Sequence, residues 1–216
     1  MSHTIYYMAI SPQSRLYARL QQEKAMYILM VHSFDCCFKV MSEYEEPEDA
    51  DEETLEILMN GYSDVFKSKV ETRQLVDDFQ AEVERTQIKV AYFESSSVEI
   101  EKRLTQELNR RQSSDVAFLS SLLFGDRDFA PHWFPGVRQD LNLVSLPIVQ
   151  QGARILSGIK LHSLFNVDED AEDWNWDDPD IEDAFEGWWY ARQFWYWKRL
   201  YLEAAAAREE ILVGIN

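Results

Sequence analysis

The stretch that most constrains the fold is residues 178–207, DPDIEDAFEGWWYARQFWYWKRLYLEAAAA, which concentrates an unusual amount of aromatic surface. Asp178 and Pro179 are typical of a helix start, because a carboxylate caps free N–H groups and proline has the φ angle of a first turn. Acidic residues follow at once, and Lys198, Arg199 and Arg208 lie towards the other end, which suits the helix dipole. We therefore expect one long helix.

Apolar side chains fall on both sides of this helix when they are placed at about 100° per residue. One broad face holds Ile181, Ala184, Phe185, Trp188, Trp189, Ala191, Trp195, Tyr196 and Leu202. The opposite side holds Tyr190, Phe194, Trp197 and Tyr201. A helix that is apolar on both sides is normally buried on both sides, so we expect a central core helix. The alternative is that one aromatic face docks a partner or ligand. For Arg192 and Arg199, structural ion pairs are a stronger expectation than anion binding.

The remaining elements are expected to be mostly helical. Strands are predicted at residues 4–10, 141–146 and 211–215, which are rich in β-branched, aromatic or aliphatic side chains. One or two helices are predicted at residues 16–41, opened by Ser11 and Pro12, and further helices at residues 54–61, 63–93, 97–112, 114–125 and 147–165. The helices over 63–93 and 97–112 are expected to form a helical hairpin. Residues 42–53 are predicted to be a charged loop, and residues 126–136 a second loop that contains His132.

Several segments resemble the YfbM-like family of bacterial domains of unknown function. They are YYMAISP at residues 6–12, SDVAFLSSLLFG at 114–125, LVSLPIVQQGARIL at 143–156, and the aromatic helix that runs into ILVGI. The chain departs from the family pattern because residues 43–110 look inserted and the tryptophan often found in the middle helix is absent. The resemblance implies an α+β fold in which the terminal strands share a small sheet covered by helices. It implies no activity and no catalytic residue.

The resulting expectation is a single domain over residues 1–216 with a predominantly helical α+β fold. Its small sheet is expected to include the N- and C-terminal strands. A long aromatic helix near the C-terminus and the acidic loop plus helical hairpin, at about residues 43–110, complete the expected architecture.

Negative charge is concentrated in two segments. The net charge is −18, and residues 43–56 and 168–186 hold nine and eleven carboxylates with no basic residue. The two segments thus hold 20 of the chain's 39 Asp and Glu residues. The rest of the chain has 19 acidic residues and 21 Lys and Arg residues, so it is almost neutral. Concentrated charge of one sign focuses a field towards a cationic partner. Direct nucleic-acid binding is not expected, because phosphates are bound by clustered Lys and Arg.

The second acidic segment supplies the candidate site, because Trp174 and Trp176 lie among its carboxylates. Indole rings supply buried contact area at interfaces, and carboxylates steer and orient a basic partner. The predicted partner-binding residues are Asp168, Asp170, Glu172, Asp173, Trp174, Trp176, Asp177, Asp178 and Asp180. The alternative is that both tryptophans pack back onto the domain while the acids stay solvated.

Catalytic and metal-binding signatures are not found in the sequence. The four histidines are scattered, and there is no nucleophile elbow, phosphate-binding loop or dinucleotide fingerprint. Residues 168–179 alternate acids as an EF-hand loop does, but Asp173 replaces the glycine and Pro179 the glutamate that such a loop needs. We expect no cofactor and no metal. An enzyme with an unrecognised site near His132 or the acidic segment remains an alternative.

The sequence therefore predicts a cytoplasmic, acidic protein-binding module. The most concrete version is an immunity or inhibitor protein that neutralises a basic toxin or nuclease, and a DNA-mimic inhibitor is an alternative. Adjacent Cys36 and Cys37 are expected to be reduced core thiols. We expect no signal peptide and no membrane span, and the oligomeric state stays open.

Overall fold

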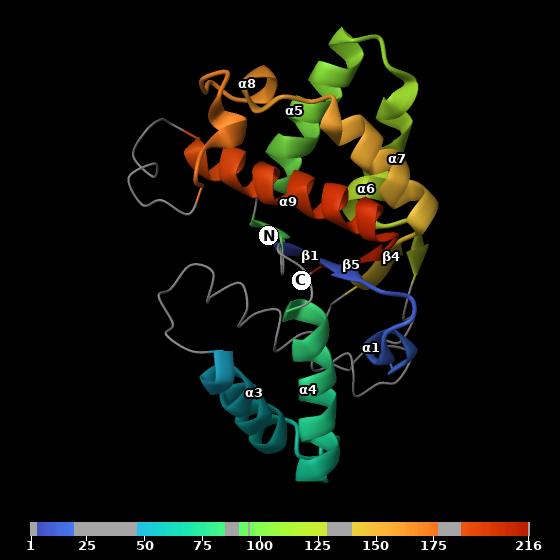
Figure 1. The fold of residues 1–216 in the computed structure, drawn as a ribbon, viewed down its shortest axis with the longest axis vertical. Helices are drawn as coiled ribbons and strands as arrows, with labels where there is room; N and C mark the ends of the chain where they lie inside the picture. Colours follow the sequence, from blue (N-terminus) through green and yellow to red (C-terminus); the bar gives the residue numbers. More distant parts are fainter. Residues whose placement is uncertain are drawn as a thin grey trace.

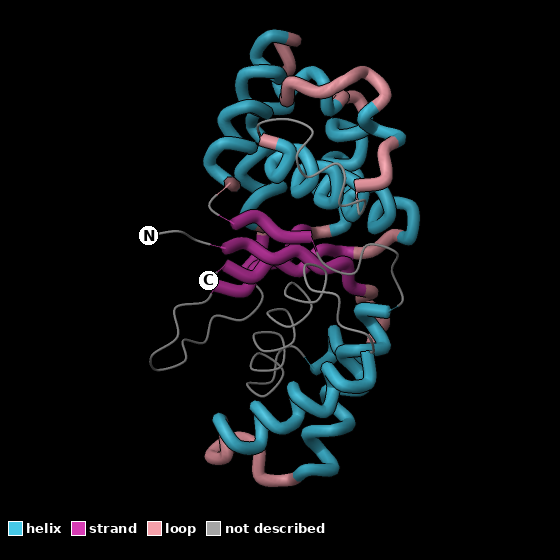
Figure 2. The backbone as a smooth tube through the Cα atoms, turned by 90° about the vertical axis from the view of Figure 1, so that its left-hand side faces the viewer, coloured by secondary structure: helices cyan, strands magenta, loops and turns pink. Residues whose placement is uncertain are grey.

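The computed structural model describes residues 4–19, 47–84, 91–94, 96–128, 140–176 and 187–215. In this part of the chain an antiparallel sheet lies between two groups of helices, as Figures 1 and 2 show. The fold is predominantly helical α+β, as expected from the sequence. No helix among the described residues has the length and apolar character needed to cross a membrane.

The sheet has five strands in the order β2-β1-β5-β4-β3, and every neighbouring pair is antiparallel. The strands are β1 (Thr4–Ile10), β2 (Ala91–Glu94), β3 (Arg127–Asp128), β4 (Asp140–Val144) and β5 (Glu210–Ile215). Tyr7 pairs with Val213, so the first and last strands lie side by side in the middle of the sheet. The three predicted strands and the shared sheet of the terminal strands are confirmed.

Side chains alternate between the two faces of the sheet, and each face has its own core. Ile5, Tyr7 and Val213 belong to the larger core, whereas Met8 and Leu212 belong to the smaller one. The larger core is covered by α5 (Ser97–Arg110), α6 (Leu119–Phe124), α7 (Leu146–Ser157), α8 (Leu161–Leu164) and α9 (Trp188–Ala207). The smaller core is covered by α1 (Arg15–Arg19), α3 (Pro47–Gly61) and α4 (Lys69–Glu84). Helices therefore lie on both sides of the sheet (Figure 2).

Helix α9 is the centre of the larger core. The side chains of Phe194, Trp197 and Tyr201 are fully buried, and the Trp197 ring lies 5.0 Å from the Tyr201 ring and 5.9 Å from the Tyr7 ring, between centroids. The Tyr201 hydroxyl donates to the Leu122 carbonyl at 2.6 Å. The core-helix prediction is thus confirmed for residues 188–207. The narrower aromatic face is the deeper one, and the predicted helix start at Asp178 lies outside the described residues.

Helices α7 and α9 pack closely because a glycine stands at their contact. A Cβ atom on Gly152 would lie 2.8 Å from the Tyr201 ring and 2.7 Å from the Leu122 side chain. Both distances are well inside van der Waals contact, so any larger residue forces the two helices apart.

The region between residues 42 and 112 differs from the prediction in two ways. Helix α3 begins at Pro47, within the stretch expected to be a loop, because a proline followed by Glu48 and Asp49 is a favourable first turn. The helical hairpin is formed by α3 and α4, not by residues 63–93 with 97–112. Residues 91–94 are instead the edge strand β2, with Ala91 and Phe93 in the larger core. This strand separates α4 on one face from α5 on the other (Figure 1).

The remaining predicted elements agree with the structure in part. The 3-10 helix η1 (Ser114–Phe118) and α6 cover the predicted helix at residues 114–125, and Ser113 caps it by accepting from the Asp115 N–H. The single helix predicted at residues 147–165 is divided into α7 and α8 by residues 158–160, and residues 127–128 of the predicted loop form strand β3. Of the helical stretch at residues 16–41, the structure describes the part within α1, and residues 20–46 and His132 lie outside the described part.

Candidate functional site

The chain between α8 and α9 forms a compact acidic turn, which we define as residues 168–173. Its backbone is closed by hydrogen bonds from the Ala171 N–H to the Asp168 carbonyl at 3.2 Å and from the Asp173 N–H to the Asp170 carbonyl at 2.9 Å. The last three residues are the 3-10 helix η2 (Ala171–Asp173). Such i to i+3 bonds fold the chain tightly.

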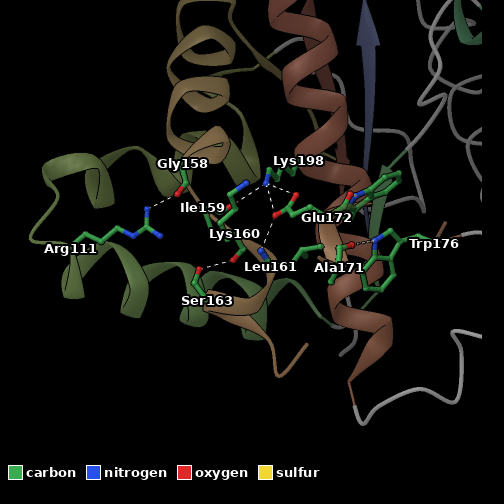
Figure 3. A network of polar contacts seen from close by, with 11 residues as sticks. Arg111, Gly158, Ile159, Lys160, Leu161, Ser163, Ala171, Glu172, Trp176 and Lys198 are labelled. Carbon is green, nitrogen blue, oxygen red and sulfur yellow. Dashed lines mark hydrogen bonds and ion pairs between the residues drawn. The ribbon is translucent and has the colours of Figure 1, made fainter. Parts of the chain in front are cut away.

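Glu172 attaches the acidic turn to the two helices that flank it. Both of its carboxylate oxygens accept from Lys198 Nζ of α9 at 2.9 Å, and Oε1 also accepts from the Leu161 N–H at 2.9 Å (Figure 3). Lys198 is 5% exposed and also donates to the Ile159 carbonyl at 2.8 Å. The buried ammonium group therefore has a charged partner and a carbonyl, which is what burial of a charge requires.

Two indole rings fix the backbone of the same turn. Trp176 is 2% exposed, and its Nε1 donates to the Ala171 carbonyl at 2.9 Å (Figure 3). Trp195 of α9 donates from Nε1 to the Glu172 carbonyl at 3.2 Å. Together with the ion pair, these contacts hold the acidic turn in one position against the larger core.

The remaining acidic side chains of the turn face solvent. Asp168, Glu169, Asp170 and Asp173 are exposed, and within the described part of the chain they form no ion pair. Trp174 is half-buried beside them, and its ring packs against that of Trp176 with centroids 5.6 Å apart. The result is a set of four solvated carboxylates next to one partly accessible indole.

The predicted site residues thus divide into two groups. Asp168, Asp170, Asp173 and Trp174 reach the surface, whereas Glu172 is occupied by Lys198. Trp176 is a core residue in this conformation, so its ring has almost no surface to offer a partner, and the expectation for this residue is corrected. Its burial follows from the indole N–H finding a carbonyl within the turn. Asp177, Asp178 and Asp180 lie outside the described residues.

Sequence reasoning missed the two residues of α9 that secure the turn, Lys198 and Trp195. The sequence did contain a signal for Lys198, because an ammonium group in a helix that is apolar on both sides needs a carboxylate partner. Spacing along the chain could not identify that partner as Glu172, which lies 26 residues away.

Metal binding finds no support in the described residues. They contain no group of three or more His, Cys, Asp or Glu side chains placed to hold a metal ion. The EF-hand-like alternation of acids is interrupted physically, because Glu172 points at Lys198 and not at its neighbours.

The described part of the first acidic segment, residues 47–56, belongs to α3, on the side of the sheet that holds the smaller core. Glu52 of α3 forms an ion pair with Arg73 of α4, and Glu56 is exposed. The described acids of the two segments therefore do not converge on one site.

A groove of about 390 Å³ lies between α5 and α8. It is lined by Glu99, Lys102, Arg103, Gln106, Glu107, Arg110, Ser163 and Leu164. Glu107 is 5% exposed and accepts hydrogen bonds from Arg110 and Arg111. Hydrogen bonds donated by Arg110, and in second place by Arg111, lower the pKa of the Glu107 carboxyl to about 2, although burial acts in the opposite direction.

Comparison with protein-family models, with curated proteins and with solved structures gave no match. The resemblance to the YfbM-like family therefore stays a prediction from the sequence, and the site has to be interpreted from its own geometry.

Proposed function

We propose that this protein is an acidic binding protein whose acidic turn docks a basic protein. The observation that carries the proposal is the combination of four exposed carboxylates with a backbone that Glu172, Trp176 and Trp195 hold in place. A fixed turn has little conformational entropy left to lose on binding. Fixed carboxylates also steer a cationic surface during encounter and set its orientation.

Trp174 gives the proposed interface an apolar centre. Its ring is half-buried, so it has a defined position, and it retains accessible surface next to Asp173. Tryptophan is enriched among residues that dominate binding energy, and an indole face attracts Lys and Arg side chains. A partner that presents Lys or Arg beside apolar surface would satisfy both the ring and the carboxylates.

In its most concrete form the proposal is an immunity or inhibitor protein that neutralises a basic toxin or nuclease. Segregated acidic residues favour this role because they complement the positive surfaces with which nucleases bind their substrates. The proposal includes a cytoplasmic location, which suits the adjacent Cys36 and Cys37.

The experiment is affinity capture from the cells that make the protein, with wild-type and variant bait. The variant carries Asp168→Asn, Asp170→Asn and Asp173→Asn, which removes charge at nearly constant shape. The control removes three exposed acids from the α3 and α4 side through Glu56→Gln, Asp64→Asn and Asp77→Asn. We expect wild type and control to retain the same basic protein in stoichiometric amount and the variant to lose it. Equal retention by all three baits, or no stoichiometric partner, would reject the proposal.

A further inference from the structure

We draw no further inference here: the strongest candidate, the pair of buried side chains Gln193 and Trp197 where α9 packs against β2 and the start of α5, has Nε2 and Nε1 donors without a hydrogen-bond partner within the described part of the chain, but nothing in that part of the structure shows a cavity beside them or what would accept from them.

Discussion

Replacing Lys198 with methionine should destabilise the fold by about 2–3 kcal/mol. Methionine keeps the apolar stem in its place on α9 but removes the ammonium that bonds Glu172 and the Ile159 carbonyl. Breaking a buried ion pair by removing one partner costs about 3–5 kcal/mol, because a buried charge is left uncompensated. We expect less here, since the Glu172 side chain is 20% exposed and keeps the Leu161 N–H.

Lys198→Met leaves the Glu172 carboxylate without its ammonium partner. In the double variant Lys198→Met with Glu172→Met no unpaired charge remains, so it should be more stable than Lys198→Met alone. With the single variant Glu172→Met the cycle is complete and gives the coupling energy between the two side chains, because each change is then measured with and without the other. Lys67→Met is the matched control. Its ammonium is exposed on the other side of the sheet, and we expect a cost below about 1 kcal/mol.

Urea denaturation followed by circular dichroism measures the free energy of unfolding, and hydrogen exchange measures the local effect. The amides of Ala171 and Asp173 should exchange faster in Lys198→Met, because the turn loses its attachment to α9, and should be unchanged in Lys67→Met. A cost for Lys198→Met below about 0.5 kcal/mol, with unchanged exchange in the turn, would refute the view that this ion pair holds the site.

Three further changes test the packing that supports the site. Glu107 has a folded-state pKa of about 2, below its ordinary 4.5, so it stabilises the fold above pH 4.5 and this contribution is lost as the pH falls to 2. Glu107→Gln should remove about 1–2 kcal/mol at neutral pH and flatten acid unfolding in that range, which urea titrations at several pH values measure. Gly152→Ala should lower stability by about 1–3 kcal/mol in the same assay, because its methyl group meets the Tyr201 ring; no loss would contradict that contact. Trp176→Ala should cost about 3–5 kcal/mol as a core substitution, and a cost below about 1 kcal/mol would argue against its burial.

The strands and the core helix were predictable because their patterns are local. The β-branched and aromatic composition of residues 4–10 and the apolar side chains on both sides of residues 188–207 each indicate one type of element, and the structure has both. Which aromatic face lies deeper was not predictable, because it depends on the size of the space between α9 and the sheet. Trp197 and Tyr201 on the narrower face fill that space completely.

The errors occurred where two local signals competed. Residues 91–94 are few and directly follow a stretch with helical spacing, which predicts a continuing helix through residue 93, whereas pairing with β1 makes them a strand. The candidate site shows the same limit. Exposure of Asp168 and Asp170 agrees with their charge, but the inward direction of Glu172 depends on Lys198, a contact between residues distant in sequence.

The most direct test of the proposed function is the association rate constant of a captured basic partner with wild type and with the triple amide variant at Asp168, Asp170 and Asp173. The account predicts a fall of about tenfold or more in the variant, and a similar fall for wild type between about 0.15 M and 1 M salt. An association rate that changes with neither the carboxylates nor the salt would contradict it.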